Sequence, residues 1–301
     1  MRLVVAVGGN ALLRRGEPPD AAVQQHHVRT AARSLAPLTV EHQLVLVHGN
    51  GPQVGLLAEE SSADPALSSP YPLDVLVAQT QGMIGYWFLQ ALREAGVRRP
   101  VLAVLTQTVV SATDPAFRAP SKPVGAGLSQ ADAVLVGQRH GWTMGRDGDR
   151  WRRVVPSPEP LRVLERASIA GLVEAGTVVV CGGGGGVPVF EGADGELRGA
   201  EAVVDKDLTA ALLAIGLEAD RLVLLTDVAG VLDGFGTPAA SLRPVLHATD
   251  VDAMGLAAGS MGPKVEACRR FATATGRTAV IGALDDAAAV VAGDTGTTVT
   301  A

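Results

Sequence analysis

The sequence predicts an α/β fold built around a doubly wound, mostly parallel sheet, and two observations carry this prediction. Apolar runs rich in Val and Leu recur along the chain, and each run is nearly continuous, as is typical of parallel strands covered on both faces. Helical patterns separate these runs, which is the order of elements in α/β domains. The runs that predict strands are 2–7, 43–48, 101–106, 177–181, 221–226 and 278–282.

The segments between these runs space their apolar residues as amphipathic helices do. Some of them end in Ala-Gly or Thr-Gly, where glycine favours the left-handed conformation that closes a helix before the next strand. The predicted helices are 21–38, 74–96, 160–176, 206–219 and 263–276. No internal repeat or linker divides the chain, so residues 1–301 are expected to form a single domain with a substantial core.

Residues 113–158 break this alternation. They are rich in proline and contain a hairpin-like turn at 144–151. A long loop inside a compact domain is usually functional, so we expect a small protruding subdomain that acts as a lid. A second hairpin is expected at 187–204, turning on the Ala-Asp-Gly sequence at 193–195.

Composition narrows the class of protein. Hydrophobic residues make up 47% and charged residues 19%, which suits a globular protein, and the net charge of −6 argues against nucleic acid as a partner. The longest basic cluster, Arg-Trp-Arg-Arg at 150–153, is interpreted as surface charge. Neither a signal-peptide core nor an apolar run of about 18 residues occurs. We therefore expect a cytoplasmic protein that binds small molecules and no membrane.

Cysteine and histidine positions give no sign of a metal site. Cys181 and Cys268 have neither disulfide nor metal-ligand spacing and are expected in the core. His26 and His27 lie on a predicted helix, with no spacing to a cluster of other ligands. His48, at the end of a predicted strand, is expected to pack rather than to catalyse.

Glycine clusters follow three of the predicted strands, at 6–11, 47–55 and 180–189, and one of them contains five consecutive glycines. Ligands of α/β sheets bind beyond the carboxyl ends of the strands. Glycine at these ends lets backbone N–H groups approach an anion. The clusters therefore favour a phosphate site over the alternative, which is a set of tight turns.

Standard nucleotide fingerprints do not explain these clusters. The chain has no P-loop motif. Residues 234–239, Gly-Phe-Gly-Thr-Pro-Ala, match the dinucleotide pattern of glycines, but they do not open a helix after a strand. The match is interpreted as chance, which leaves a dehydrogenase weakly supported.

Lysine usage is the most unusual feature of the sequence. Of 25 basic residues only three are lysine, namely Lys122, Lys206 and Lys264. An ammonium is a compact point charge that can follow a moving oxygen, whereas a planar guanidinium prefers fixed bidentate geometry. Phosphoryl transfer requires mainly positioning and neutralisation of charge, so the three lysines are candidates for that chemistry.

Nine blocks carry a specific resemblance, which runs in order from residue 3 to about residue 299. They are VVAVGGNAL, VHGNGPQVG, TQGMIGYW, LTQTVV, SKPVG, RRVVPSPEP, CGGGGGVPV, AVVDKD and GSMGPKVEA. These blocks are similar to those of the carbamate kinase family in the amino-acid kinase superfamily. The resemblance implies a three-layer α/β/α sandwich with a protruding subdomain, a homodimer, and transfer of a phosphoryl group between ATP and carbamate to give ADP and carbamoyl phosphate, a reaction of arginine metabolism. The high transfer potential of carbamoyl phosphate favours the direction of ATP synthesis.

The resemblance also implies roles for charged residues, because all three lysines lie within the resembling blocks. Lys206 and Lys264 would bridge the phosphates of the nucleotide and the transferring group, and Lys122 would close over the acceptor. Asp207 would orient the ammonium groups, since a nearby carboxylate favours the charged amine. Asp205 is interpreted as a helix N-terminal charge. Carbamate is already an anion, so no general base is needed.

Further residues are expected around the ligands. The phosphate and acceptor site would consist of Gly8, Gly9, Asn10, Gly49, Asn50 and Gly51, with backbone N–H groups as donors. The nucleotide site would consist of Gly182, Gly183, Thr226, Phe235 and Met261. Mg²⁺ would bind to the nucleotide phosphates rather than to a protein metal site.

Two departures and two alternatives accompany this resemblance. The family commonly carries a Tyr-Gly-Lys-Pro-like sequence where this chain has Phe235 and Thr237. A kinase of the same fold acting on another small carboxylate or phosphate stays open, although the blocks at 48–55 and 121–125 offer no extra arginine for a larger acceptor. A non-catalytic nucleotide sensor also stays open, although it would be expected to have lost a lysine or Asp207.

Overall fold

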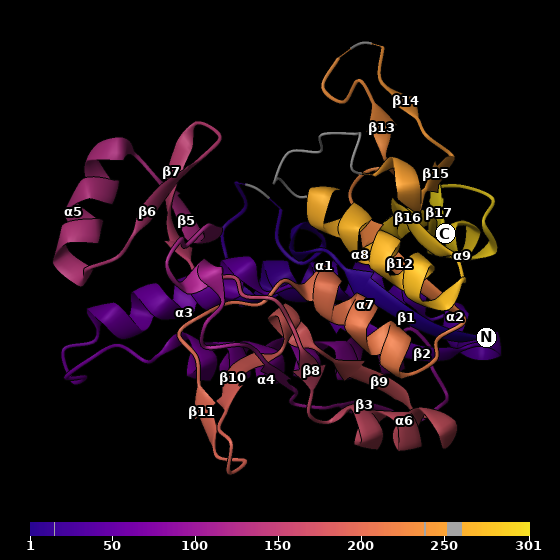
Figure 1. Ribbon diagram of the computed structural model, residues 1–301, viewed down its shortest axis with the longest axis horizontal. Coiled ribbons are helices and arrows are strands. Elements are labelled where there is room, and N and C mark those ends of the chain that lie inside the picture. The colour runs from indigo at the N-terminus through magenta and orange to yellow at the C-terminus, as the bar shows by residue number, and fades with distance from the viewer. Residues whose placement is uncertain (15, 238, 252–260) are drawn as a thin grey trace.

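The computed structural model describes residues 1–14, 16–237, 239–251 and 261–301. Within these residues, eight strands form the central sheet in the order β15-β17-β16-β12-β1-β2-β9-β3, mostly in parallel pairs, with β16 and β17 antiparallel (Figure 1). Their bounds are β1 (Arg2–Val7), β2 (Gln43–His48), β3 (Val101–Ala103), β9 (Val178–Cys181), β12 (Arg221–Thr226), β15 (Val245–His247), β16 (Ala279–Ala283) and β17 (Thr297–Thr300).

Helices cover both faces of this sheet. Successive residues of β1 point to opposite sides, so that Val5 joins one buried cluster with Phe88 of α4 while Val4 joins the other with Phe271 of α8. Truncating either phenylalanine would cost about 3–5 kcal/mol of stability. The three-layer prediction is confirmed. The helices are α1 (Ala21–Leu35), α2 (Leu38–Glu41), α3 (Gly51–Ala63), α4 (Leu73–Glu94), α5 (Gln130–His140), α6 (Arg166–Glu174), α7 (Lys206–Gly216), α8 (Met261–Thr275) and α9 (Ala287–Ala292).

Two differences from the sequence-based prediction bear on the site. The strand predicted at 101–106 ends at Ala103. The chain then leaves the sheet, and the backbone N–H of Thr106 donates to the side chain of Gln81 instead of to a neighbouring strand. Helix α3 was not predicted, since its sequence contains two glycines and two serines that obscure the helical spacing. This helix begins at Gly51, within the second glycine cluster, and so takes part in the site described below.

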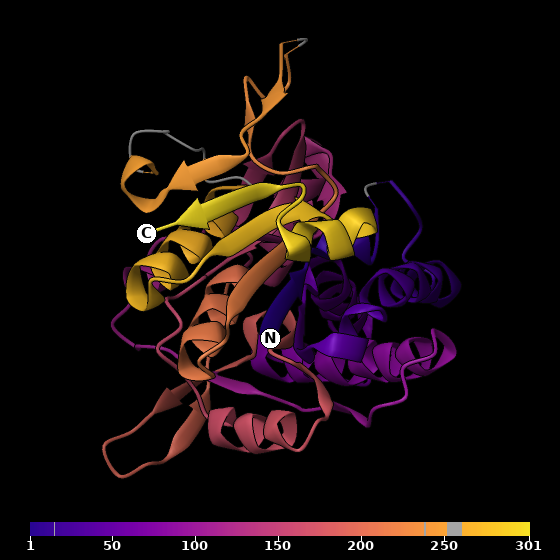
Figure 2. The same ribbon diagram turned by 90° about the vertical axis from the view of Figure 1, so that its right-hand side faces the viewer.

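Smaller sheets flank the central one. A second sheet has the order β11-β10-β4-β8 and contains the expected hairpin at 187–204. Figure 2 shows this hairpin and the β13–β14 hairpin projecting from opposite ends of the molecule. No helix among the described residues is long and apolar enough to cross a membrane. The strands are β4 (Gln107–Val109), β8 (Arg162–Val163), β10 (Val187–Glu191), β11 (Leu197–Gly199), β13 (Leu232–Asp233) and β14 (Ser241–Leu242).

Residues 122–155, called the flap below, form their own sheet in the order β5-β7-β6, accompanied by α5 (Figure 1). They lie within the segment 113–158 that interrupts the sequence pattern, and the turn at 144–151 joins β6 to β7. The strands are β5 (Lys122–Leu128), β6 (Met144–Asp147) and β7 (Arg150–Val155).

The flap rests on α3 through a backbone contact. A Cβ added to Gly55 of α3 would lie 1.9 Å from the Cα of Gly125 in β5, and Gly125 has a positive φ of 76°. Only glycine fits at both positions, since a side chain on Gly55 would overlap the opposite backbone and Gly125 has a left-handed conformation. The flap therefore lies directly against the helix that follows β2.

Arg153 corrects one interpretation made from the sequence. Its guanidinium lies 4.3 Å from the centre of the Trp142 ring and 3.1 Å from a carboxylate oxygen of Glu201. Burial lowers its pKa, while Glu201 opposes that shift. The interpretation of this arginine as surface charge was wrong, because the guanidinium is stacked and paired between the flap and the segment before α7.

Candidate active site

The candidate site lies where several carboxyl ends of strands meet. Parallel pairing aligns Val7 of β1 with His48 of β2 and with Leu225 of β12. The first two glycine clusters therefore leave the sheet at one edge. Helices α7 and α8, which pack side by side (Figure 1), begin with Lys206 and with the turn containing Lys264.

Two of the predicted glycine loops touch each other and a lysine at this edge. A Cβ added to Gly49 would lie 2.8 Å from the backbone N of Gly9 and 3.5 Å from the Cδ of Lys206. Such a distance to a backbone atom is too short for any side chain. Glycine is required here because two strand ends and a lysine side chain converge.

The backbone donors at this edge differ from the expectation in part. The N–H of Gly8 donates to the carbonyl of Leu225, and that of Gly49 donates to the carbonyl of Val7, each at 3.1 Å. These two N–H groups extend the sheet pairing and are not directed at a phosphate, which corrects the prediction for them. Gly9 lies in the short helix Gly9–Ala11 and Gly51 begins α3. The side chain of Asn10 lies outside the described part of the structure.

All three lysines of the chain converge on two aspartates at the start of α7. Lys206 and Lys264 each place Nζ 3.0 Å from a different carboxylate oxygen of Asp207. Lys122, which is the first residue of the flap, places Nζ 2.8 Å from Oδ2 of Asp205. The expected contact of Asp207 with ammonium groups is thus present in the structure, and the partner of Lys122 was missed by the sequence reasoning.

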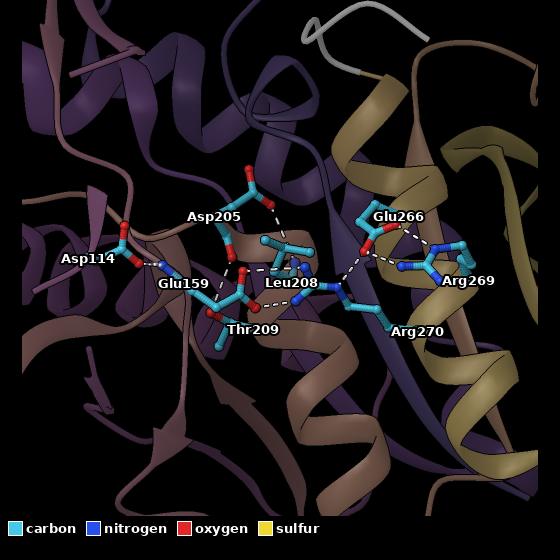
Figure 3. A network of polar contacts seen from close by, with 8 residues as sticks. All are labelled: Asp114, Glu159, Asp205, Leu208, Thr209, Glu266, Arg269 and Arg270. Atoms are coloured by element: carbon cyan, nitrogen blue, oxygen red, sulfur yellow. Dashed lines mark hydrogen bonds and ion pairs between the residues drawn. The ribbon is translucent and has the colours of Figure 1, made fainter. Parts of the chain in front are cut away.

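Asp205 is the N-cap of α7, in agreement with its predicted place at a helix start. Its Oδ1 accepts a hydrogen bond from the backbone N–H of Asp207 at 2.9 Å. It also accepts one from the backbone N–H of Leu208 at 3.3 Å (Figure 3). Caps of this kind satisfy the orphan donors of a helix N-terminus. The Asp-Lys-Asp sequence at 205–207 is the signal that could have pointed to two carboxylates with separate partners.

Attraction between the lysines and aspartates of this cluster opposes the cost of burying their charges. Burial tends to raise the pKa of Asp205, but Lys122 and Lys206 hold that pKa well below its ordinary value. Burial lowers the pKa of Lys206, and repulsion by Lys264 adds to the effect against the attraction of Asp207. The pKa of Lys264 is raised, because its interactions with Asp207 outweigh burial. The cluster contains three ammonium groups and two carboxylates. Its excess positive charge favours the binding of an added anion.

His48 packs beneath the site, as predicted. It is buried, and burial lowers its pKa to about 4, so the ring is neutral near pH 7. Its Nδ1 lies 3.0 Å from the carbonyl oxygen of Gly49, which can only accept, so Nδ1 carries the proton. A neutral histidine in this place shapes the loop and does not exchange protons near pH 7.

The run of five glycines, 182–186, is a buried turn rather than an open cradle. The N–H of Gly182 donates to Oγ1 of Thr106 at 2.7 Å. A Cβ on Gly183 would lie 2.4 Å from the His48 ring, and one on Gly184 would lie 2.1 Å from the side-chain amide of Asn50. This packing favours the tight-turn alternative, because the glycines make room for side chains of the 48–50 loop.

The remaining predicted nucleotide residues lie on separate elements. Thr226 ends β12, and its Oγ1 lies 3.0 Å from Oδ1 of Asp227. Phe235 lies in the turn between β13 and β14 and is 75% exposed. Met261 is the first residue of α8 and is half-buried.

A polar network connects the base of the flap to the helix that carries Lys264. Figure 3 shows Arg270 of α8 between the carboxylates of Glu159 and Glu266, with Arg269 on the far side of Glu266. The backbone N–H of Glu159 donates to Oδ2 of Asp114 at 2.9 Å. The two ends of the segment 113–158 are thereby held to each other and to α8. Sequence reasoning missed this network.

Comparison with known proteins defines the class. The chain belongs to the amino acid kinase family, which it matches over residues 1–283. It is similar to a carbamate kinase of Rhizobium meliloti, with 48% identity over 99% of this chain and 92% of that protein. It is also similar to carbamate kinase of Giardia lamblia, solved with citric acid (TM-score 0.93, 35% identity) and with AMP-PNP (TM-score 0.89, 34% identity), each covering 99% of this chain and 98% of the other.

Proposed function

We infer that this protein is a carbamate kinase, which transfers a phosphoryl group reversibly between ATP and carbamate to give ADP and carbamoyl phosphate. The observation that carries this inference is the meeting of all three lysines with Asp205 and Asp207 at the edge where the glycine loops converge. The full-length similarity to carbamate kinases supports the same activity.

The chemistry needs electrostatic stabilisation from the protein and no base. A carbamate oxygen attacks the γ-phosphorus while the bond to the ADP oxygen breaks, and both partners are anions. We propose that Lys206 and Lys264 neutralise the oxygens of the transferring group, which is worth most in a site shielded from water. Asp207, paired with both, would keep the two ammonium groups in place during transfer.

The acceptor would bind between the glycine loops and the flap. The backbone N–H groups of Gly9 and Gly51 and the N-terminus of α3, which spans 13 residues, are suited to an anion. Asn50, whose side-chain amide donates to Thr80 at 2.8 Å, would hold the loop in shape. Lys122 would close over the acceptor from the flap.

The nucleotide would extend toward β12 and α8. We propose Thr226, Phe235 and Met261 as its contacts, with the phenyl ring of Phe235 stacking on adenine. Gly182 and Gly183 would act indirectly, by supporting the 48–50 loop. Both aspartates of the cluster are engaged by lysines, and the described residues include no cluster of three His, Cys, Asp or Glu fit to hold a metal. We propose that Mg²⁺ is held by the nucleotide phosphates, where it would neutralise further charge.

A homodimer and a cytoplasmic location complete the proposal. Helix α4 exposes Val75 and Tyr86, eleven residues apart and so on one face, and the neighbouring edge strand β3 exposes Leu102. Such an apolar patch is typical of a protein interface. Light scattering after size exclusion should give twice the chain mass of 30.8 kDa, and Tyr86→Arg should shift it toward the monomer.

The activity is tested by ATP formation from ADP in the presence of Mg²⁺. Carbamoyl phosphate should be the best donor among acyl phosphates of similar size, because the full-length similarity of the chain is to carbamate kinases. If acetyl phosphate or an amino-acid acyl phosphate were better by about tenfold, a difference of roughly 1.4 kcal/mol in transition-state binding, the acceptor would be another carboxylate. Nucleotide binding without turnover of any donor would identify a sensor.

A further inference from the structure

Lys122 differs from the other two lysines in how it reaches the cluster. It is the first residue of β5, it pairs with Val155 across the flap sheet, and it lies 83 positions before Asp205 in the chain. Its ammonium group reaches the start of α7 through the 2.8 Å ion pair to Oδ2 of Asp205. The position of that ammonium group therefore depends on this carboxylate.

Asp205 uses its two oxygens for two different purposes. Oδ1 caps α7 and holds the backbone N–H of Asp207, the residue that binds Lys206 and Lys264. Oδ2 faces the flap and binds Lys122. Capping alone does not need a charge, because serine and asparagine cap helices about as well as aspartate. The second oxygen is thus what distinguishes aspartate at this position.

We propose that Asp205 is a positioning residue that draws the flap lysine, Lys122, to the transferring group while it caps the helix that carries Lys206 and Asp207. An ammonium has three N–H donors, so the contact with Asp205 leaves donors that can bind oxygens of carbamoyl phosphate. This proposal rests on the proposed function for the identity of that ligand, whereas the link between Asp205 and the flap stands on the ion pair itself.

The test separates the cap from the charge. Asp205→Ser retains a capping oxygen and removes the carboxylate, and Lys122→Met removes the partner. Asp205→Ser should raise the KM for carbamoyl phosphate about tenfold, the scale of one hydrogen bond to a charged group, with a smaller change in kcat. On the Lys122→Met background the same substitution should cause no further rise, because its effect acts through Lys122.

A second measurement does not depend on activity. In the ligand-free protein, amide hydrogen exchange over residues 122–128 should be faster in Asp205→Ser and in Lys122→Met, and to the same extent in both. A melting temperature of Asp205→Ser within a few degrees of the wild type would show that the introduced hydroxyl still caps α7.

Three outcomes would overturn the proposal. Asp205→Ser could reduce activity by the same factor with and without Lys122, which would show that the carboxylate of Asp205 does not act through Lys122. It could leave KM unchanged in an active enzyme, or it could leave exchange over 122–128 unchanged. A wild-type enzyme that does not use carbamoyl phosphate would instead refute the proposed function, while the exchange experiment would still test the contact between Asp205 and the flap.

Discussion

The two halves of the lysine cluster are built differently. Lys206 and Lys264 lie in the first turns of helices that pack on the central sheet, their side chains are 13% and 7% exposed, and they share Asp207, which is 4% exposed. Lys122 comes from the flap, its side chain is 26% exposed, and its partner Asp205 is 18% exposed. The half with Lys206 and Lys264 therefore lies against the main core, whereas Lys122 in the other half comes from a separate small sheet.

This difference indicates how the fold combines a fixed part of the site, on α7 and α8, with a flap that can give access to ligands. Buried, paired charges are preorganised and need little rearrangement during reaction. The flap has few fully buried residues, among them Val124, Ala133 and Val155, and segments with few buried contacts open at low cost. The fixed half would stabilise the transferring group, whereas the flap half would respond to the presence of the acceptor.

The strongest test of the fixed half is removal of its shared carboxylate. Asp207→Ala leaves two largely buried ammonium groups beside each other, and breaking a buried pair costs about 3–5 kcal/mol of stability. Urea denaturation should show this loss, and activity should fall with it. Asp233→Ala, which breaks an exposed pair with Arg243, should cost at most about 1 kcal/mol. Equal stabilities of the two variants would contradict the comparison.

The next test keeps the charge and changes its shape. Lys206→Arg and Lys264→Arg should each lower kcat about 100-fold, or about 3 kcal/mol, because a planar guanidinium cannot replace a buried point charge on the transferring group. Steady-state kinetics and thermal melts measure the effect. Arg98→Lys is the control. Arg98 is exposed and precedes β3, away from the carboxyl ends of the strands where the site lies, so this substitution should leave kcat unchanged. Near-normal rates in both Lys→Arg enzymes would show that catalysis does not require an ammonium group at either position.

His48 tests how well the fixed half is shielded from water. Its pKa is about 4 in the folded protein against an ordinary value of 6.5, so the unfolded chain binds a proton more readily. Its contribution to stability is complete above pH 6.5 and is lost as the pH falls toward 4, by about 3 kcal/mol in all. Denaturation across this range should show a smaller slope in His48→Gln, and His26→Gln on the exposed face of α1 should keep the wild-type slope. An unchanged slope in His48→Gln would mean that the ring is not shielded.

The smallest expected effect belongs to the flap. Lys122→Arg should raise the KM for carbamoyl phosphate about tenfold and change kcat less than the substitutions on α7 and α8, because it alters one hydrogen-bonding charge on a segment that can adjust. Hydrogen exchange over residues 113–128 should slow when carbamoyl phosphate is bound to the wild type. A loss confined to kcat, or exchange that ligand does not change, would place Lys122 in the fixed half.

The central layer could be predicted from the sequence because it depends on local patterns. The strands at 2–7, 43–48 and 221–226 were predicted with the bounds that the structure has, since continuous apolar runs specify strands covered on both faces. The rarity of lysine selected three side chains that the fold brings together. Asp207 was assigned to them through the resemblance to the carbamate kinase family, because adjacency alone does not bring two side chains of a helix together.

Tertiary structure alone decided the contacts between distant segments. No local pattern joins Lys122 to Asp205, stacks Arg153 on Trp142, or packs the glycines at 182–186 against His48 and Asn50. The same holds for the N–H groups of Gly8 and Gly49, which are used by neighbouring strands. Periodicity and composition report whether a residue is buried and in which element. Which partner it meets is set by how the layers pack, because that geometry depends on the whole chain.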